Sequence, residues 1–394
     1  MLDYGVLPTP ALARQALADG VPAIMVTGSH IPFDRNGLKF YRPEGEITKD
    51  DEAAILATAV DLPDLGEPER APESDQARQA YVQRNTDWFG GTPLAGRRVG
   101  LYSHSAAGRD VNRAVLEALG ATVVELGRSE SFVPVDTEAV SKADRESGRR
   151  WAAEYELDAI LSTDGDGDRP LVADEQGEWL RGDVLGLLCA RELGIRALAV
   201  PVSCNTAIEA SGAFDEVLRT RIGSPYVLAG MATLRERHDR VAGFEANGGF
   251  LLGTSVEADG QRLNALPTRD ALLPALTVMV AAARRAMPLS RLVGELPARY
   301  TASDRLQDFP RETSQEMLAA WQAEPAAMRQ ALGLGSPIAA VDTTDGLRVT
   351  LEDGDIVHLR PSGNAPELRC YAEADSPERA ASLVTTTLEK LAGA

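Results

Sequence analysis

Short apolar segments alternate with longer amphipathic segments along most of the chain. Residues 22–27 predict a strand, and residues 50–60 predict a helix with acidic side chains in its first turn. A strand at 97–104, a helix at 111–120 and a strand at 121–126 repeat this order. Strands that alternate with helices in this way are typical of α/β layers.

The alternation continues toward the C-terminus and then changes character. Further strands and helices are predicted at 158–163, 184–192, 197–203, 215–222, 225–238 and 240–247. Beyond about residue 300, residues 342–362 predict a hairpin with its turn at 352–355. The last segment predicts a closing helix with Ser376 as its N-cap. These elements indicate a smaller α+β domain at the C-terminus.

The length of 394 residues exceeds that of a typical single domain. The fold class we expect is α/β, with three α/β mixed-sheet domains and a smaller C-terminal α+β domain around a central cleft. Each domain is expected to contribute one loop to that cleft. The predicted domains are residues 1–90, 91–192, 193–300 and 301–394.

The chain is strongly acidic, with 59 Asp and Glu residues against 40 Lys and Arg residues and a formal net charge of −19. Such a charge disfavours binding to nucleic acid and to anionic membranes. An anionic substrate therefore needs a local basic pocket. The apolar segments are too short to span a bilayer, and the first residues lack the pattern of a secretory signal. We therefore expect a cytoplasmic protein.

Cysteine and histidine are sparse and scattered. Cys189, Cys204 and Cys370 form no CxxC pair, which indicates small buried side chains in a reducing compartment rather than a disulfide framework or a zinc site. The four histidines exclude a His-rich metal centre and leave few partners for a Ser-His-Asp triad.

A serine follows the first predicted strand, in the segment VTGSHIP at 26–32. Gly28 allows a sharp backbone bend that presents the hydroxyl of Ser29 as a nucleophile, and Pro32 stiffens the exit from the turn. The alternative interpretation is an ordinary turn between strand and helix, in which the serine is a helix cap.

Three aspartates at every second position follow the strand predicted at 158–163. Asp164, Asp166 and Asp168 alternate with glycines in TDGDGDRP, so an extended loop is expected to turn their carboxylates toward one point. Hard oxygen ligands of this kind suit Mg²⁺. The sequence therefore predicts a magnesium site in this loop.

Other hypotheses apply to the same loop, besides a simple acidic turn. A calcium-binding EF-hand is disfavoured because Arg169 stands where that loop needs glycine, Pro170 follows it, and strands flank the loop. An aspartyl phosphotransferase of the haloacid dehalogenase type stays open. In that case Asp164 would be the nucleophile, since a strand that ends in Asp-x-Asp fits its pattern loosely.

Two further loops carry polar side chains suited to a phosphosugar. In GFEANGG at 243–249, Glu245 and Asn247 are expected to point the same way from an extended loop and to grip two adjacent hydroxyls. The segment RPSGNAPELR at 360–369 combines guanidinium, hydroxyl, amide and backbone N–H donors into a predicted anion cradle. Its candidate phosphate ligands are Arg360, Ser362, Gly363, Asn364 and Arg369. Each segment taken alone is also compatible with an ordinary polar turn.

Together, the four segments resemble the phosphoserine, metal, sugar-binding and phosphate-binding loops of the α-D-phosphohexomutase family, in order and with domain-sized spacing. The resemblance covers essentially the whole chain. It implies an isomerase that acts as an intramolecular phosphotransferase. In such an enzyme Ser29 carries a phosphate that binds Mg²⁺ together with Asp164, Asp166 and Asp168. Phosphate then moves to the substrate, hexose 1,6-bisphosphate forms as intermediate and activator, and the other phosphate returns to the serine.

The resemblance also implies roles for individual residues. Glu245 and Asn247 hold the sugar in either orientation, while the 360–369 loop holds the phosphate that does not react. Lys39 matches the basic residue near the phosphoserine and assists proton transfer. Arg169 orients the phosphate at the metal, and His30 orients the nucleophile or shuttles protons.

The segments are most similar to those of bacterial phosphomannomutases, which interconvert mannose 1-phosphate and mannose 6-phosphate. A phosphoglucomutase or phosphoglucosamine mutase of the same family stays open as an alternative. Two hypotheses from other classes are the aspartyl phosphotransferase and a non-catalytic phosphosugar-binding protein. Small hexose phosphates are the expected partners, and the protein is expected to be a monomer or a homodimer.

Two features depart from the family pattern. The chain opens at GVLPTPAL, inside the usual first domain, so the N-terminal part of domain 1 is expected to be missing, with a sheet edge and apolar surface uncovered. In TRIGSPYV, Ser224 stands where many members have His or Asp. We assign Ser224 to the substrate-binding set and expect that the acid or base of that position is absent or supplied elsewhere.

Overall fold

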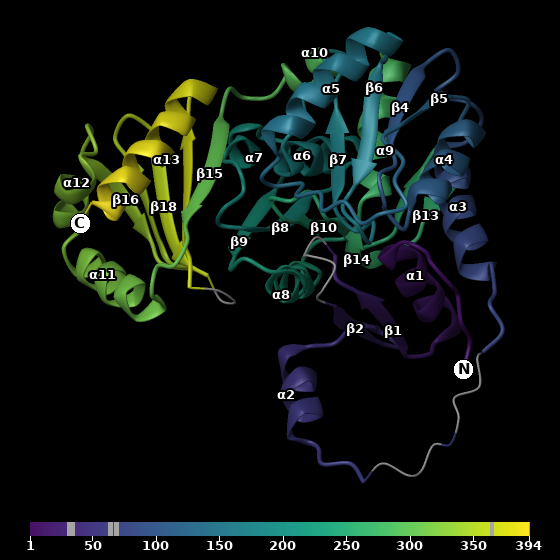
Figure 1. Ribbon diagram of the computed structural model, residues 1–394, viewed down its shortest axis with the longest axis horizontal. Helices are drawn as coiled ribbons and strands as arrows, with labels where there is room; N and C mark the ends of the chain where they lie inside the picture. Colours follow the sequence, from purple (N-terminus) through teal and green to yellow (C-terminus); the bar gives the residue numbers. More distant parts are fainter. Residues whose placement is uncertain (30–35, 62–65, 67–70, 363–365, 394) are drawn as a thin grey trace. The chain divides into compact units, whose positions relative to one another are not determined.

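The protein forms two compact units built from α/β layers (Figure 1). The computed structural model describes residues 1–29, 36–61, 66, 71–362 and 366–393. The first unit comprises residues 1–199 and 223–293, and the second comprises residues 200–222 and 294–394. Mixed and antiparallel sheets with packed helices confirm the predicted multidomain α/β class, while the four predicted domain boundaries stay a prediction.

The N-terminal sheet of the first unit consists of antiparallel strands β1 (Ala23–Thr27), β2 (Gly37–Arg42) and β3 (Gly45–Glu46). Helix α1 (Thr9–Asp19) packs against β1 and β2, and α2 (Lys49–Ala57) follows with Thr48 in a capping box. Side chains alternate along β1, so that Ile24 and Val26 are 55% and 61% exposed. Apolar surface is therefore exposed on this small sheet.

The second sheet of this unit has the order β5-β4-β6-β7. Strand β4 runs parallel to β5 and β6, and β7 is antiparallel to β6. Every residue of β6 is buried, which agrees with the apolar residues Ala159, Ile160 and Leu161 at its start. The elements are α3 (Gln76–Phe89), β4 (Arg98–Tyr102), α4 (Arg109–Ala118), β5 (Thr122–Leu126), α5 (Lys142–Tyr155), β6 (Ala159–Thr163) and β7 (Pro170–Ala173).

In the third sheet, strands β14, β11, β10 and β8 lie side by side in that order. Helix α9 is buried along nearly its whole length and packs against α6, so both helices are apolar on most faces. This part of the unit contains α6 (Gly182–Glu192), β8 (Ala197–Pro201), α8 (Ser224–Leu234), β10 (Val241–Phe244), β11 (Phe250–Leu252), β14 (Leu266–Asp270), α9 (Leu272–Arg284) and α10 (Leu289–Val293). Strands β12 (Val256–Ala258) and β13 (Gln261–Leu263) form a separate two-stranded antiparallel sheet.

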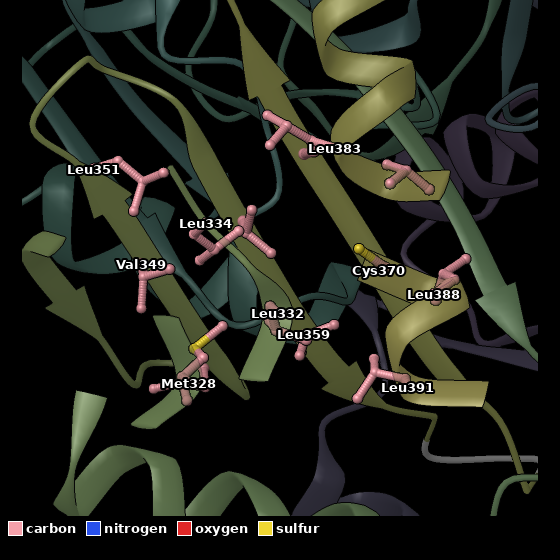
Figure 2. Close-up of a cluster of buried hydrophobic side chains, with 14 of the residues drawn as sticks. Met328, Leu332, Leu334, Val349, Leu351, Leu359, Cys370, Leu383, Leu388 and Leu391 are labelled. Atoms are coloured by element: carbon pink, nitrogen blue, oxygen red, sulfur yellow. The ribbon is translucent and has the colours of Figure 1, made fainter. Parts of the chain in front are cut away.

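The second unit is built on an antiparallel sheet of order β15-β19-β18-β17-β16. Apolar side chains of its strands and helices form one core. Figure 2 labels ten of these side chains. The elements are α7 (Ala207–Ala210), β9 (Glu216–Thr220), β15 (Tyr300–Leu306), α11 (Arg311–Ala323), α12 (Pro325–Leu332), β16 (Ile338–Asp342), β17 (Leu347–Leu351), β18 (Ile356–Pro361), β19 (Leu368–Ala374) and α13 (Pro377–Ala392).

Polar contacts join the two chain segments of the second unit. Asn205 donates a hydrogen bond to the carbonyl of Arg299 at 2.8 Å, and the Arg299 guanidinium lies 2.6 Å from Glu373. Thr206 also donates to Glu373. Both arginine and carboxylate are largely buried, so the pair fixes the start of β15 against residues 205–206.

Several predicted elements are confirmed within a few residues. The predicted hairpin is β17 and β18, and the closing helix is α13, where Ser376 accepts a hydrogen bond from the backbone N–H of Arg379. The three cysteines are buried and no disulfide bond joins them, as expected. Within the part of the chain that the structure describes, no helix has the length and apolar character needed to cross a membrane.

Protonation of His358 is expected to destabilise the protein in acid. The ring is buried, and burial lowers its pKa to about 4, although its hydrogen bond to the Asp345 carbonyl acts in the opposite sense. The unfolded chain, with a pKa of about 6.5, then binds a proton that the folded chain does not. The contribution of His358 to the free energy of unfolding is therefore largest above about pH 6.5 and is smaller by about 2 kcal/mol at about pH 5.

Urea denaturation of the wild type and of His358→Gln near pH 7.5 and pH 5 measures this effect. Gln donates the same hydrogen bond without titrating, so the variant should lose less stability in acid than the wild type. His238→Gln, at a partly exposed position, should behave like the wild type. Equal losses in the wild type and in His358→Gln would contradict the assignment.

Candidate active site

Ser29 lies directly after β1 in a strained backbone conformation. Its φ is +52°, which side-chain-bearing residues rarely adopt and which is common at functional sites. Its backbone N–H donates to Thr27 Oγ1 at 2.8 Å, and its hydroxyl donates to Asp164 Oδ2 at 2.9 Å. A Cβ on Gly165 would lie 2.4 Å from the Ser29 carbonyl oxygen. Glycine at 165 therefore allows the two loops to approach each other.

The three aspartates after β6 lie together as predicted, but in a turn rather than an extended loop. Asp164 Oδ1 accepts hydrogen bonds from the backbone N–H groups of Asp168 and Arg169, both at 3.2 Å, so the loop folds back on itself. All three carboxylates are buried, and one oxygen from each lies within 4.8 Å of the others. The turn, rather than alternate spacing, brings them to one point.

The chemistry of this cluster fits a bound cation. Asp166 Oδ1 and Asp168 Oδ1 are buried and accept no hydrogen bond from the described residues. Burial, together with the negative charges of Asp168 and Asp166, raises the pKa of Asp164 well above its usual range. A divalent cation would remove this repulsion and coordinate the free oxygens, and carboxylates are suitable ligands for hard cations.

Basic side chains from distant elements face the cluster. Lys39, on β2, lies 2.6 Å from both Asp166 Oδ2 and Asp168 Oδ2. Arg269, on β14, lies 2.9 Å from Asp168 Oδ2, and Arg169 lies within 4 Å of two of the aspartates. Burial raises the pKa of Asp168, but the charges of Arg269, Lys39 and Arg169 outweigh it and hold that pKa below its usual range.

The first turn of α1 also contacts the predicted metal loop, residues 164–168. The backbone N–H of Thr9 donates to the carbonyl of Asp166 at 2.8 Å, and the Thr9 hydroxyl donates to Asp166 Oδ2 at 2.9 Å. The positive end of the helix dipole therefore lies beside a carboxylate. Thr9 is buried and was not among the predicted site residues.

The sugar-binding candidates follow β10 and are also held in a turn, not in the expected extended loop. Glu245 Oε2 accepts a hydrogen bond from Arg269 Nη1 at 3.1 Å. Asn247 Oδ1 accepts from the backbone N–H of Gly249 at 3.0 Å, and the Asn247 carbonyl accepts from Thr137. Arg269 thus connects the predicted sugar loop directly to the predicted metal loop.

Ser224 lies at the start of α8 and donates a hydrogen bond to Glu46 Oε2 at 3.3 Å. Glu46, on β3, also accepts from Thr268 Oγ1 at 2.6 Å. A carboxylate from the N-terminal sheet therefore stands beside the position where the family pattern has His or Asp. Sequence reasoning missed Glu46.

In the second unit, the predicted phosphate ligands lie at the ends of β18 and β19. Arg360 and Arg369 are directly opposite in the strand register, so both guanidinium groups leave the same face of the sheet. Arg360 Nε lies 2.9 Å from Asp345 Oδ2, and the backbone N–H of Ser362 donates to the Glu367 carbonyl. Like charges opposite each other favour a bound anion. Gly363 and Asn364 lie outside the described residues, as does His30.

The missed residues Thr9, Glu46 and Arg269 belong to no recognisable sequence pattern. Arg269 lies in the strand LPTRD, where it alternates with the buried residues Thr268 and Asp270. An arginine between two buried polar residues of a strand indicates a buried ion pair only weakly. Its partners are set by pairing of β14 with β11 and are not visible in sequence spacing.

Models of one protein family match most of the chain. Their descriptions are phosphoglucomutase/phosphomannomutase alpha/beta/alpha domains I, II and III and the C-terminal domain. They match residues 1–62, 79–177, 181–300 and 310–390, respectively.

Similar proteins include a phosphomannomutase of Salmonella muenchen, which is 54% identical over 391 residues that cover 98% of this chain and 81% of that protein. A phosphomannomutase of Sinorhizobium fredii is 46% identical, with 99% of this chain and 84% of the relative covered. A solved phosphoglucomutase/phosphomannomutase family protein from Burkholderia thailandensis superposes with a TM-score of 0.68 at 22% identity, over 99% and 82% of the two chains.

Asp164→Asn is expected to abolish stabilisation by a divalent metal without destabilising the metal-free protein. Asn keeps an oxygen for the backbone N–H groups of residues 168 and 169 and removes a charge that burial and two neighbours disfavour. Thermal unfolding with MgCl₂ and with a chelator measures the effect. At about 100 times its Kd, the metal should stabilise the wild type by about 2.7 kcal/mol.

Asp87→Asn, at an exposed position on α3, is the matched control and should keep the full metal effect. Equal stabilisation of Asp164→Asn and the wild type by the metal would show that the cation binds elsewhere.

Proposed function

The chain belongs to the phosphoglucomutase/phosphomannomutase family, and on this basis we propose that it interconverts mannose 1-phosphate and mannose 6-phosphate through a phosphate carried by Ser29. The observation that carries the proposal is the hydrogen bond from the Ser29 hydroxyl to Asp164 within the buried aspartate cluster. The proposal includes the four domains bounded near residues 90, 193 and 300. The preference for mannose follows the names of the two relatives.

Ser29, Asp164, Asp166 and Asp168 are the residues that would hold Mg²⁺, with Ser29 contributing through its phosphate. When bound, the ion would act as a Lewis acid that offsets negative charge on the transferring phosphoryl group. The protein's own part is positioning. The Ser29 turn, held by Thr27 and Asp164, fixes the direction of the phosphoryl group toward the substrate.

Transfer in one direction breaks the bond from Ser29 Oγ to phosphorus and forms a bond from the substrate hydroxyl oxygen to phosphorus. The product is hexose 1,6-bisphosphate, which reorients and returns its other phosphate to Ser29. The proton of the attacking hydroxyl passes to solvent as the bond forms, and Ser29 Oγ takes up a proton as its bond to phosphorus breaks. Lys39 stays protonated, because Asp168 and Asp166 raise its pKa more than burial and Arg269 lower it. We therefore assign Lys39 as a cation and proton donor to the leaving oxygen.

The other predicted residues complete the substrate site. Glu245 and Asn247 hold sugar hydroxyls, and Ser224 lies in the same substrate-binding set. Arg169 orients the phosphate at the metal, and His30 orients the nucleophile. The phosphate that does not react is held by Arg360, Ser362, Gly363, Asn364 and Arg369. Support for this last role comes from the two guanidinium groups on one face of the sheet.

The geometry favours Ser29 over Asp164 as the nucleophile. Asp164 Oδ2 accepts the Ser29 hydroxyl, and its Oδ1 accepts two backbone N–H groups. A carboxylate engaged on both oxygens is a poorer nucleophile than a hydroxyl that an adjacent carboxylate orients. This is the physical reason for preferring the mutase to the aspartyl phosphotransferase.

Ser29→Ala is expected to lower the turnover of mannose 1-phosphate about a thousandfold or more, because the phosphate carrier is lost. The assay follows formation of mannose 6-phosphate with Mg²⁺ and a trace of hexose 1,6-bisphosphate. Glucose 1-phosphate and glucosamine 1-phosphate are tested in parallel. Ser131→Ala, at an exposed position, should retain full activity.

The outcomes separate the competing functions. Activity that survives Ser29→Ala but is lost in Asp164→Asn, with an acyl phosphate, would support the aspartyl phosphotransferase. A wild type that binds the sugar phosphate in calorimetry without converting it would be a binding protein. Faster turnover of glucose or glucosamine phosphate than of mannose phosphate would change the substrate assignment.

Arg360→Gln is expected to raise KM about 10- to 100-fold and to change kcat less. The phosphate that Arg360 is proposed to bind does not react, so it is the same in the ground state and in the transition state. Loss of the Arg360 side chain should therefore weaken the binding of both states equally. A hydrogen bond to a charged group is worth about 1.5–3 kcal/mol, which corresponds to this range. Steady-state kinetics measures the split, and Arg311→Gln at an exposed position of α11 is the control. An unchanged KM would remove Arg360 from the phosphate site.

A further inference from the structure

A cavity of about 370 Å³ opens within the second unit. Its volume falls within the range of pockets that bind small molecules. One wall comes from the 200–222 segment, and the other comes from strands β16, β17 and β18. Among the described residues that line this cavity, none belongs to the four predicted loops. The cavity is therefore a candidate site that the proposed function does not use.

Three arginines of the described chain line the cavity, and carboxylates neutralise two of them. Arg219 donates Nε and Nη2 to the two oxygens of Glu209, at 2.8 and 2.6 Å. Arg299 Nε lies 2.6 Å from Glu373 Oε1, and Glu373 Oε2 accepts the backbone N–H of Thr206 at 3.0 Å. Both oxygens of each carboxylate are thus occupied.

The third arginine, Arg348 on β17, has neither a hydrogen bond nor an ion pair within 4 Å among the described residues. Asp342 lies opposite it in the strand register, but Asp342 Oδ1 accepts the backbone N–H of Thr344 at 2.8 Å. Burial and the charge of Arg219 lower the pKa of Arg348, and the surrounding carboxylates only partly offset this effect. A partly buried, unpaired guanidinium that opens on a cavity indicates a position for an anion.

Thr350 places a hydroxyl beside this guanidinium. It lies on the same face of β17 as Arg348, since the residues that alternate with them belong to the apolar core. Its hydroxyl has no hydrogen-bond partner within the described part of the chain. Val202 and Ile356 add apolar surface to the lining. The cavity thus offers one cation, one hydroxyl and an apolar wall.

We propose that this cavity binds a small organic monocarboxylate, whose carboxylate accepts hydrogen bonds from Arg348 and Thr350 and whose apolar part packs against Val202 and Ile356. A guanidinium presents two parallel N–H groups that match the two oxygens of a carboxylate. A monoanion fits better than a phosphate dianion, because one unpaired guanidinium supplies a single positive charge and three carboxylates lie around it. The proposal goes beyond the mutase reaction.

The cavity is distinct from the proposed phosphate site on the same sheet. Arg360 lies opposite Arg369 in the strand register, whereas Arg348 lies opposite His358, two residues before Arg360 on β18. Arg360 is engaged by Asp345 and does not line the cavity. A variant at Arg360 therefore separates binding at the two positions.

The test uses butyrate as the probe, with acetate and inorganic phosphate titrated in parallel into the full chain. NMR of labelled isoleucine methyl groups reports binding at Ile356, whose signal is assigned with Ile356→Val. Butyrate should shift this signal in a saturable manner. Each methylene that packs against the wall should tighten binding about fourfold, so butyrate should bind up to about 15-fold more tightly than acetate. Phosphate should bind more weakly than butyrate at this position.

Arg348→Gln should raise the Kd for butyrate about 10- to 150-fold, because a hydrogen-bonded charge pair is lost. Arg348→Lys should have a smaller effect, since an ammonium keeps the charge without the two parallel N–H groups. Thr350→Val should raise the Kd about 2- to 12-fold and serves if the Arg348 variants do not fold. Arg360→Gln and Arg311→Gln, the latter at an exposed position, should keep the wild-type Kd.

An unchanged Kd in Arg348→Gln would overturn the proposal. It would also be overturned by loss of butyrate binding in Arg360→Gln, which would place the probe at the phosphate site. Absence of a saturable Ile356 shift with either carboxylate would mean that the cavity is not such a site, and tighter binding of phosphate than of butyrate would contradict the monocarboxylate assignment. The readout does not depend on turnover, so failure of the proposed function would leave this result unaffected.

Discussion

The arrangement of the first unit depends on the electrostatic repulsion among three buried carboxylates. Asp164, Asp166 and Asp168 place oxygens within 4.8 Å of one another in the interior, where removal of each charge from water costs several kcal/mol. Among the described residues, Lys39 and Arg269 form the closest ion pairs with this cluster. Their charges, rather than apolar packing alone, fix the β1–β2 hairpin and strand β14 against the end of β6.

The same constraint explains the glycines of the metal loop. Gly165 lies against the carbonyl of Ser29, where a Cβ would approach to 2.4 Å, and Gly167 has a φ of +71° and lies against Pro8. These glycines let the strained Ser29 turn and the N-terminus of α1 approach the carboxylates closely. Close approach is what brings the Ser29 hydroxyl into contact with Asp164. The strained conformation of Ser29 is therefore supported by its contacts with Thr27 and with the loop of Asp164 and Gly165.

In the second unit, positive charges rather than negative charges are held close together. Arg360 and Arg369 are cross-strand neighbours, and like charges directly opposite each other destabilise a sheet. Asp345 offsets part of this charge through its contact with Arg360. Although the chain as a whole is acidic, Arg360 and Arg369 lie side by side and give this position the positive charge that binding of a phosphate dianion requires. In both units, like charges are gathered where we propose that a ligand binds.

Local sequence determined the elements and the four candidate loops, because these depend on neighbouring residues. Apolar periodicity predicted β1, β6 and β10, and each is followed by the polar loop that was singled out, with Ser29, the three aspartates, and Glu245 with Asn247. Sheet pairing and loop closure decided the rest. They converted two expected extended loops into turns, and they brought Thr9, Lys39, Glu46 and Arg269 to sites more than 20 residues away. Contacts over such separations depend on strand order and burial, for which no local pattern exists, and therefore only the tertiary structure revealed Arg269 as the link between the metal loop and the sugar loop.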